Sequence, residues 1–406
     1  MQVKRNAFIL GWFVYAVFFF AGADAVRAFQ VGDLDIGGAM RVSYTIGDYG
    51  PDVGHPSRAE GDGGTFALDT FRINLDYLHG PWAAKVEYRF YPGYAASNHD
   101  GYHFLHTGWV GYHFADEAQL QMGVNRVPFG PGPYGVSRSF FFDLHFYVGL
   151  SDDMDLGIKY TRHFGELTVD VGYYCADEGT YFGATEDSTR YSYDVVDETG
   201  SGYEERHQIN VRGIYALGDM DIGASFQYGL LNSNGSQDDG SHFAGSIHAV
   251  PKFGDATLAL QLTYYSLDVD ENQPEGTDKL VTMGAFDFPT LVAARAWIPA
   301  ASLSYRFDTD AVDWLDYILP YIEYSSIVKD ESGFNDSRML TFGSAWAHGG
   351  WFIYTDLVYA NGNDFIGNKS GYGTPPGLPY FASNRFGENL TNEWEYRFNI
   401  NFGYYF

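Results

Sequence analysis

The sequence predicts an all-β fold, a closed antiparallel β-barrel of about sixteen strands that crosses a membrane. Segments in which apolar and polar residues alternate recur along most of the 406 residues, as expected for strands with one lipid-facing and one water-facing side. The connections between these segments are alternately long and short. Aromatic residues make up 18% of the chain, with 33 Tyr and 33 Phe, which suits two aromatic girdles around a barrel.

The first 28 residues have the pattern of a cleaved secretory signal peptide. Lys4 and Arg5 are followed by an uncharged apolar run at 7–21, and small-residue cleavage patterns end at Ala25 and Ala28. Because the run is short and ends in cleavage sites, we expect removal of residues 1–28 rather than a retained membrane helix. Residues 29–406 then form a single barrel domain.

Sixteen alternating segments are predicted as strands. In the second of them, for example, Phe71 and Ile73 alternate with Arg72 and Asn74. The predicted strands are 34–48, 66–79, 81–91, 106–115, 118–126, 155–163, 167–176, 206–216, 220–231, 242–252, 256–268, 298–307, 317–328, 338–348, 351–361 and 393–406.

The pattern of connections supports a barrel with both chain ends on the periplasmic side. Long connections alternate with turns of a few residues, as in outer-membrane barrels, and the strand number is even. The alternation of apolar and polar residues is weakest at 206–216, 242–252 and 298–307, where we expect register errors.

The last fifteen residues form the clearest strand. One face is wholly apolar and the other carries Glu395, Arg397 and two amides, which suits lipid on one side and a water-filled lumen on the other. The alternative is an edge strand of a soluble β-sandwich. A closing strand that ends in Phe resembles the C-terminal signal of Gram-negative outer-membrane barrels. That resemblance implies an outer-membrane location, contact with lipid and lipopolysaccharide, and Phe406 as the residue that the barrel assembly machinery reads.

The chain is strongly acidic, with 52 Asp and Glu against 24 Lys and Arg and a net charge of −28, which disfavours nucleic acid as a partner. The acids gather in turn-rich segments such as 268–278, which we interpret as solvated loops; the alternative is that they bind divalent cations that bridge lipopolysaccharide. No segment has the ligand spacing of an EF-hand, so neither a dedicated metal site nor a cofactor is predicted. Cys175 is the single cysteine, which excludes an intramolecular disulfide.

The third long connection, 127–154, is predicted to fold inward and narrow the lumen. It is rich in Pro, Gly and aromatic residues, and runs such as Phe140–Phe142 are costly to leave in water. The alternative is an ordinary external loop. The charged or titratable residues assigned to this constriction are Arg126, Arg138, Asp143, His145, Asp152, Asp153 and Asp155.

A basic patch is predicted on the wall that faces this connection. The strand phases place five cations in the lumen on four adjacent strands, although Asp76 and Glu87 lie among them. The five are Arg41, Arg72, Lys85, Arg89 and Arg397. Charged patches at a constriction set ion selectivity, with the acids of the connection opposite as the source of a transverse field. Ordinary solvation of the lumen by paired charges is the alternative interpretation.

Two stretches resemble a known family. Residues 122–130 read MGVNRVPFG and residues 153–160 read DMDLGIKY, similar to the strand–PF–loop–strand passage of the phosphate-selective porin O and P family. The resemblance implies a homotrimeric sixteen-stranded porin for passive diffusion of small hydrophilic solutes and ions, with anions such as phosphate preferred. Carbohydrate-selective and other substrate-specific porins are competing relatives.

No enzyme is predicted. The sequence has no GxSxG elbow, HExxH or Walker motif, and the histidines at 99, 103, 106 and 113 straddle a loop and a strand. An outer-membrane hydrolase and a structural or adhesin barrel are the remaining alternatives. Conductance separates them from a porin, because a filled lumen passes little current.

Overall fold

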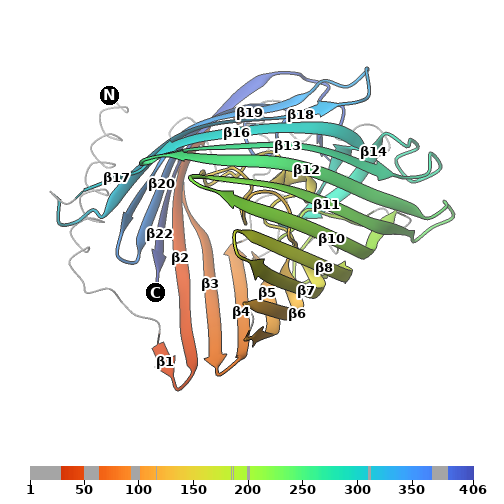
Figure 1. The fold of residues 1–406 in the computed structure, drawn as a ribbon. Helices are drawn as coiled ribbons and strands as arrows, with labels where there is room; N and C mark the ends of the chain where they lie inside the picture. Colours follow the sequence, from red (N-terminus) through yellow and green to blue (C-terminus); the bar gives the residue numbers. More distant parts are fainter. Residues whose placement is uncertain are drawn as a thin grey trace, which may run out of the picture.

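The computed structural model describes residues 29–49, 64–92, 101–115, 117–183, 185, 187–198, 202–309, 312–367 and 383–406. Its main feature is a closed antiparallel barrel of sixteen strands (Figure 1). The signal peptide predicted at 1–28 lies outside the described residues. Within them, no helix is long and apolar enough to cross a membrane.

The sixteen barrel strands follow one another around the wall, each paired with its neighbours in sequence. They are β2 (Leu34–Gly47), β3 (Thr65–His79), β4 (Trp82–Pro92), β5 (Gly101–Phe114), β6 (Ala118–Arg126), β7 (Met154–Phe164), β8 (Leu167–Asp177), β10 (Tyr203–Leu217), β11 (Met220–Ser233), β12 (Gly240–Phe253), β13 (Ala256–Asp268), β16 (Arg295–Tyr305), β18 (Tyr317–Lys329), β19 (Ser337–His348), β20 (Trp351–Asn361) and β22 (Trp394–Tyr405). The short strands β1 (Phe29–Val31) and β17 (Phe307–Asp308) extend the same sheet at β2 and β18.

The barrel closes where the first long strand meets the last. β2 pairs antiparallel with β22 from Ala39 opposite Tyr405 to Gly47 opposite Arg397. The start of β2 and the end of β22 therefore lie at the same rim. The predicted fold class and strand number are confirmed, and the three weakest patterns correspond to β10, β12 and β16. β10 has a bulge between Arg206 and Ile209, and similar register shifts occur in the pairings of β2 with β3, β4 with β5 and β7 with β8.

The barrel is apolar outside and polar inside. On β11, Phe226 and Tyr228 are 45% and 42% exposed, whereas Ser225 and Gln227, which alternate with them, are 6% and 4% exposed. The same arrangement holds on the other strands, where exposed side chains are mainly Leu, Ile, Val, Phe, Tyr and Trp. This is the reverse of a water-soluble sheet and matches a barrel whose outer face contacts lipid.

A second, four-stranded sheet forms from the long connections, and the sequence did not predict it. β14 (Leu280–Ala285) and β15 (Phe288–Ala293) form a hairpin within the predicted connection 269–297. β9 (Asp194–Val195) pairs with β14, and β21 (Ser383–Phe386) pairs in parallel with β15. The sheet joins three connections that are far apart in the sequence.

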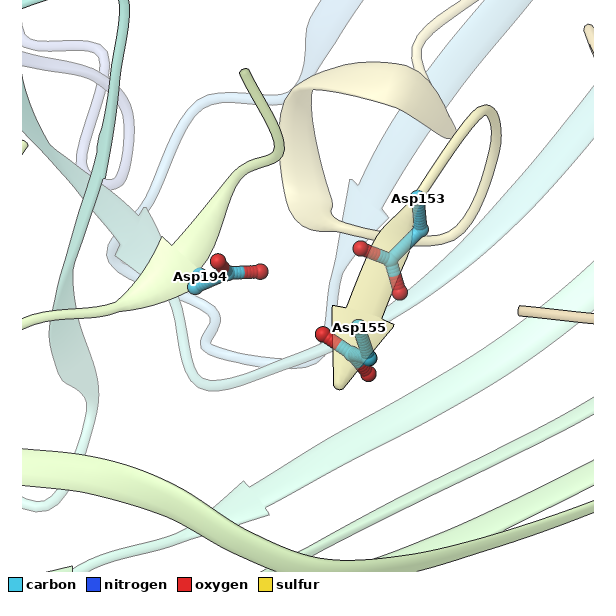
Figure 2. Close-up of side chains that lie close together, drawn as sticks. All are labelled: Asp153, Asp155 and Asp194. Carbon is cyan, nitrogen blue, oxygen red and sulfur yellow. The ribbon is translucent and has the colours of Figure 1, made fainter. Parts of the chain in front are cut away.

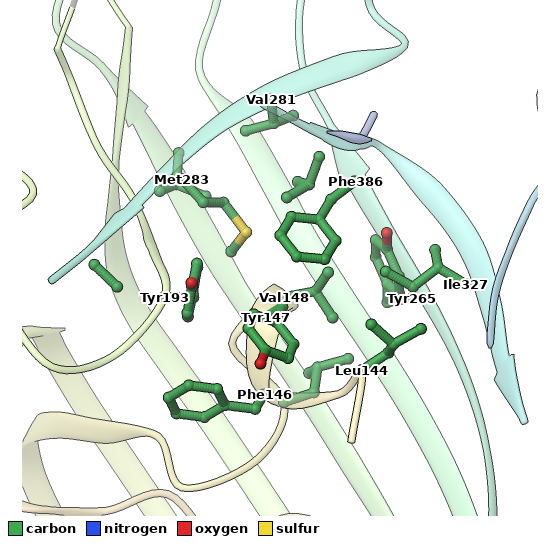
Figure 3. Close-up of a cluster of buried hydrophobic side chains, with 14 of the residues drawn as sticks. Leu144, Phe146, Tyr147, Val148, Tyr193, Tyr265, Val281, Met283, Ile327 and Phe386 are labelled. Carbon is green, nitrogen blue, oxygen red and sulfur yellow. The ribbon is translucent and has the colours of Figure 1, made fainter. Parts of the chain in front are cut away.

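The hydrophobic core lies between this inner sheet, the third long connection and the barrel wall. In the 3-10 helix Phe146–Val148, Tyr147 stacks on Phe386 of β21 and Phe146 packs against Tyr193; the same cluster includes Met283 of β14 and Tyr265 and Ile327 of the wall (Figure 3). All of these side chains are buried. Aromatic residues of the loops therefore bury one another inside the barrel, where burial of a large side chain stabilises by about 1.5–3 kcal/mol.

Candidate functional site: an arginine-lined cavity

The connection between β6 and β7, residues 127–153, crosses the barrel interior. The Gly130 N–H donates to Ser225 Oγ of β11 (3.0 Å), and the Leu144 N–H donates to Ser325 Oγ of β18 (3.1 Å). His145 Nε2 lies 2.8 Å from Thr263 Oγ1 of β13. These wall strands lie three, five and seven positions beyond β7 in the ring of sixteen, so the connection, here called the inner segment, crosses the lumen to the wall that ends at β18.

Asp143 fixes the shape of the inner segment. Its carboxylate accepts hydrogen bonds from the backbone N–H groups of Val136 (3.2 Å) and His145 (2.8 Å), and His145 Nδ1 is 2.7 Å away. Gly130 and Gly149 occupy left-handed conformations, with φ of 67° and 70°, at positions where the chain reverses. Asp143 and His145, which sequence analysis assigned to the constriction, are thus internal supports of the segment.

A cavity of about 470 Å³ lies between the inner segment and the wall formed by β2–β4, β18, β20 and β22. Five arginines line it: Arg41, Arg72, Arg89, Arg138 and Arg397. Three acids line it as well: Asp69, Asp152 and Asp287. Of its 27 lining residues, sixteen are Phe or Tyr, so the arginines stand in an aromatic surround.

The structure brings four of the five predicted patch residues together in this cavity. Lys85 is the exception: its Nζ forms a 2.8 Å ion pair with Asp76, and both side chains are well exposed. Of the seven residues assigned to the constriction, only Arg138 and Asp152 line the cavity.

Each wall arginine is held in place by a partner. Arg41 pairs with Asp69 (2.8 Å), whereas Arg72 and Arg89 share Glu87 at 3.1 and 2.6 Å. Each of these arginines is therefore partly neutralised.

Two of the five arginines form no ion pair with a carboxylate in the described part of the chain. Arg397 donates to Asn399 Oδ1 (3.0 Å) and lies 4.7 Å from the centroid of the Phe141 ring. The Arg138 backbone N–H bonds Glu323 of β18, and its side chain is exposed. These two cations give the cavity a positive excess.

Of the four acids predicted to face the arginines, Asp152 is the one that lines the cavity. Asp143, Asp153 and Asp155 do not line the cavity, and Asp152 is engaged by Arg126 (2.6 Å) and by the Tyr191 hydroxyl (2.5 Å). The transverse field expected from these four acids stays a prediction, and Asp152 is the one of them that borders the cavity.

Asp69 was missed because a β-bulge changes the phase of β3. Arg41 is opposite Thr70 and Val42 is opposite Leu68, which leaves Asp69 unopposed. Asp69 and Thr70 both turn inward and are 2% and 1% exposed. Strict alternation would have placed Asp69 on the lipid face.

Asp287 was missed because it belongs to the inner sheet. It sits in the turn between β14 and β15 with φ of 74°, and its carboxylate accepts from the Thr185 N–H (2.8 Å) and the Thr189 hydroxyl (2.6 Å). No local pattern in the sequence indicates that this turn reaches the barrel wall.

A second group of buried acids includes two residues that were assigned to the constriction. Asp153 and Asp155, at the start of β7, face Asp194 of β9 (Figure 2). Burial, and then the neighbouring carboxylates, raise the pKa of Asp153 and of Asp194 well above their usual range.

A sixteen-stranded barrel with an inward-folded segment and a charged cavity beside it defines a porin-like outer-membrane fold. Solved structures agree. The outer membrane channel DcaP of Acinetobacter baumannii superposes with a TM-score of 0.58 at 9% identity, covering 94% of this chain and 100% of that one. An anion-selective porin from Comamonas acidovorans gives 0.52 at 12% identity, covering 92% and 99%. The trimer form of OmpT, an outer membrane protein of Vibrio cholerae, gives 0.54 at 14% identity, covering 93% and 100%.

At these identities the likeness is one of fold. No protein-family model matches the chain, and no curated protein matches it. The resemblance to the phosphate-selective porin O and P family stays a prediction.

Proposed function

We propose that the chain is an outer-membrane porin through which small hydrophilic solutes diffuse, with a preference for anions. The observation that carries the proposal is the cavity beside the inner segment, where five arginines face three aspartates. Low-dielectric walls focus the field of fixed charges into such a passage. The arginines therefore outweigh the chain's net charge of −28, much of which lies in solvated loops where salt screens it.

The aromatic lining favours a second candidate, a carbohydrate-selective porin. Sixteen Phe and Tyr rings offer faces for the apolar side of a sugar ring, and the arginines offer donors to its hydroxyl groups. Phosphate or another small anion would bind the arginines and would not need the aromatic rings. Competition by sugars and by phosphate for the open current distinguishes these two solutes.

The remaining features of the proposal follow from the same fold. Residues 1–28 are removed on export, the apolar outer face contacts outer-membrane lipid and lipopolysaccharide, and Phe406 is read by the barrel assembly machinery. A homotrimer is proposed because one similar structure is described in its trimer form. No enzymatic step is assigned to the cavity.

The test is the reversal potential of single channels in a planar bilayer under a salt gradient. Replacing Arg41 and Arg72 by Ala removes two cations from the lining, including the one that pairs with Asp69 at 2.8 Å. A unit charge about 4 Å from an ion in water changes its energy by about 1 kcal/mol, so we expect the anion-to-cation permeability ratio to fall about fivefold.

The matched control is the double variant Arg295→Ala with Arg338→Ala. Both arginines pair with acids outside the cavity lining, Arg295 with Asp268 and Arg338 with Asp336, so the total charge changes equally. The control should keep the parent's reversal potential. An unchanged potential in the Arg41/Arg72 variant, or an equal change in the control, contradicts the assignment; absence of any conductance contradicts the porin function itself.

A further inference from the structure

Three buried carboxylates from different parts of the chain converge beside the start of β7. The carboxylate oxygens of Asp153, Asp155 and Asp194 lie within 4.8 Å of one another, and the side chains are 6%, 2% and 1% exposed. Figure 2 shows Asp153 and Asp155 on one segment and Asp194 facing them from β9. Such burial of like charges is costly unless something positive joins them.

Protein side chains do not supply enough positive charge. Three more buried acids, Asp177, Glu178 and Glu205, surround the triad. Arg190 is the single cation that forms ion pairs with any of these six acids in the described ranges, at 3.0 Å from Asp177 and 2.9 Å from Asp194. Six carboxyl groups thus share one guanidinium.

Glu178 gives a second, independent indication of a ligand. It is 4% exposed, and its Oε1 accepts the backbone N–H groups of Tyr191 (3.2 Å) and Ser192 (2.8 Å). Its Oε2 has no hydrogen-bond donor, although Glu178 lies within hydrogen-bonding reach of Asp194. Two carboxylates this close repel each other unless a proton or a cation lies between them.

Gln208 gives a third indication. It is 3% exposed, its Nε2 donates to Asp155 Oδ2 (3.1 Å), and its Oε1 has no partner. The bulge in β10 turns His207 outward, with φ of 54°, and brings Gln208 inward. A buried carbonyl oxygen without a hydrogen-bond donor destabilises the folded state by about 1–3 kcal/mol. A bound cation beside Asp155 would remove this penalty at Gln208 Oε1.

We propose that Asp153, Asp155 and Asp194 bind one hard divalent cation, with Ca²⁺ as the best fit, beside the carbonyl group of Gln208 and the carboxylate of Glu178. All of the donors are oxygens, which hard cations prefer. Two oxygens bound to one Ca²⁺ at about 2.3–2.6 Å are at most about 5 Å apart, which accommodates the triad, whereas Mg²⁺ demands a tighter octahedron. The Asp153 and Asp155 Oδ1 atoms, which have no hydrogen-bond partner, are free to coordinate.

The cation joins three structural parts. Asp153 ends the inner segment, Asp155 and Gln208 belong to the wall strands β7 and β10, and Asp194 and Glu178 belong to the connection between β8 and β10. Binding therefore clamps two long connections to the wall. The proposal does not depend on what passes through the barrel.

The experiment measures Ca²⁺ binding to the purified full chain, folded in detergent and stripped with EGTA, by titration calorimetry at pH 7.5. The parent should bind one Ca²⁺, and Ca²⁺ should raise the temperature at which the folded band on a gel converts to the unfolded one. Replacing Asp153 and Asp155 by Asn should weaken binding about a hundredfold or more, because ligand charge sets affinity. That variant should unfold at the same temperature with and without Ca²⁺.

The matched control replaces Asp238 and Asp239 by Asn, two neighbouring exposed acids in the connection between β11 and β12. It should bind like the parent. Equal Ca²⁺ stabilisation of parent and Asp153/Asp155 variant overturns the proposal. The proposal is also overturned if Ca²⁺ does not change the unfolding temperature of the parent at pH 7.5 and lowering the pH to 5 raises it. In that case protons, and not a cation, neutralise the buried acids.

A measurement on the parent alone guards against a variant that fails to fold. Tb³⁺ binds Ca²⁺ sites and emits when a nearby tyrosine is excited. Tyr174 and Tyr191 lie close to these acids. Tyrosine-sensitised Tb³⁺ emission that excess Ca²⁺ abolishes supports the site, and emission that Ca²⁺ leaves unchanged contradicts it.

Discussion

Glu323 is one of the wall residues that hold the inner segment. It is 4% exposed on β18 and accepts hydrogen bonds from the Ser137 hydroxyl (2.6 Å), the Arg138 backbone N–H and the Ser302 hydroxyl (2.9 Å). Hydrogen bonds to a charged group contribute about 1.5–3 kcal/mol each. Because Arg138 lines the cavity, this carboxylate also sets the position of one of its cations.

Replacing Glu323 by Ala should destabilise the fold by about 2–4 kcal/mol, because three buried donors lose their acceptor. The temperature of the folded-to-unfolded mobility change on a gel should fall, and protease should cut the inner segment more readily. Gln at position 323 keeps one carbonyl acceptor and should have a smaller effect. The matched control is Glu393→Ala, since Glu393 is exposed near the start of β22. If Glu323→Ala lowers the unfolding temperature no more than this control does, Glu323 does not anchor the inner segment.

At the residue scale, alternation predicted which arginines face inward and placed Glu87, the partner of two of them, among them, but it did not predict Asp69. Arg41, Arg72, Arg89 and Arg397 follow from period two alone. The inward position of Asp69 does not follow from period two, because the bulge in β3 shifts the alternation at that point. The residue types in the strand do not indicate where such a bulge lies.

The 3-10 helix Phe146–Val148 is held in place by packing inside the barrel. Tyr147 is 4% exposed, stacks on Phe386 at 5.1 Å between ring centroids and packs near Phe365 at 5.5 Å. Its hydroxyl donates to the Phe141 carbonyl (2.9 Å). One side chain thus links the inner segment to β21 of the inner sheet and to the chain after β20.

Replacing Tyr147 by Ala should cost about 3–5 kcal/mol, the usual range for deleting a buried aromatic ring. Phe at the same position keeps the stacking and loses only the hydrogen bond, so its cost should be about 1 kcal/mol. Because the segment borders the cavity, the Ala variant should also show larger and noisier single-channel currents. Equal currents in the Ala and Phe variants would mean that the helix does not restrain the passage.

At the element scale, the barrel strands were predictable and the inner sheet was not, for one physical reason. A wall strand has lipid on one side and the lumen on the other, so its sequence alternates. β14 and β15 are buried on both faces, and every residue of LVTMGA and FPTLVA is buried. A short apolar run without alternation fits a buried strand and a buried helix segment equally well. The parallel partner of β15 lies about ninety residues further on, at Ser383–Phe386.

On the scale of the whole molecule, charge is sorted by position. The chain has only 24 Lys and Arg against 52 acids, yet five arginines line a single cavity. Among the described residues, the acids lie in exposed connections, in the buried group around Asp194 and at single buried positions such as Glu323 and Asp356. Net charge alone would have indicated cation preference, whereas the local arrangement supports the opposite.

The barrel closes where β2 pairs with β22, a pairing here called the seam, and Phe406 directly follows β22. The Gly38 N–H donates to the Phe406 carbonyl (2.8 Å), and the Phe406 N–H donates to the Gly38 carbonyl (3.0 Å). A Cβ at position 38 would lie 2.9 Å from the Phe406 ring and 2.4 Å from the Arg72 carbonyl oxygen, so glycine lets the ring lie close against β2. Phe406 contributes to closure through its backbone and through its ring.

Deleting Phe406 should reduce the fraction of chain that reaches the membrane in heat-modifiable form, because both hydrogen bonds and the ring are lost. Two such bonds contribute about 1–3 kcal/mol, a modest loss for refolding in detergent. Phe406→Ala keeps the backbone bonds and should refold in detergent nearly as well as the parent. If the assembly machinery reads the ring, that same variant should be poorly inserted in cells.

Equal insertion of Phe406→Ala and the parent in cells would show that the aromatic ring is not the signal. An equal defect of the variant in cells and in detergent would mean that Phe406 acts in closure of the seam instead.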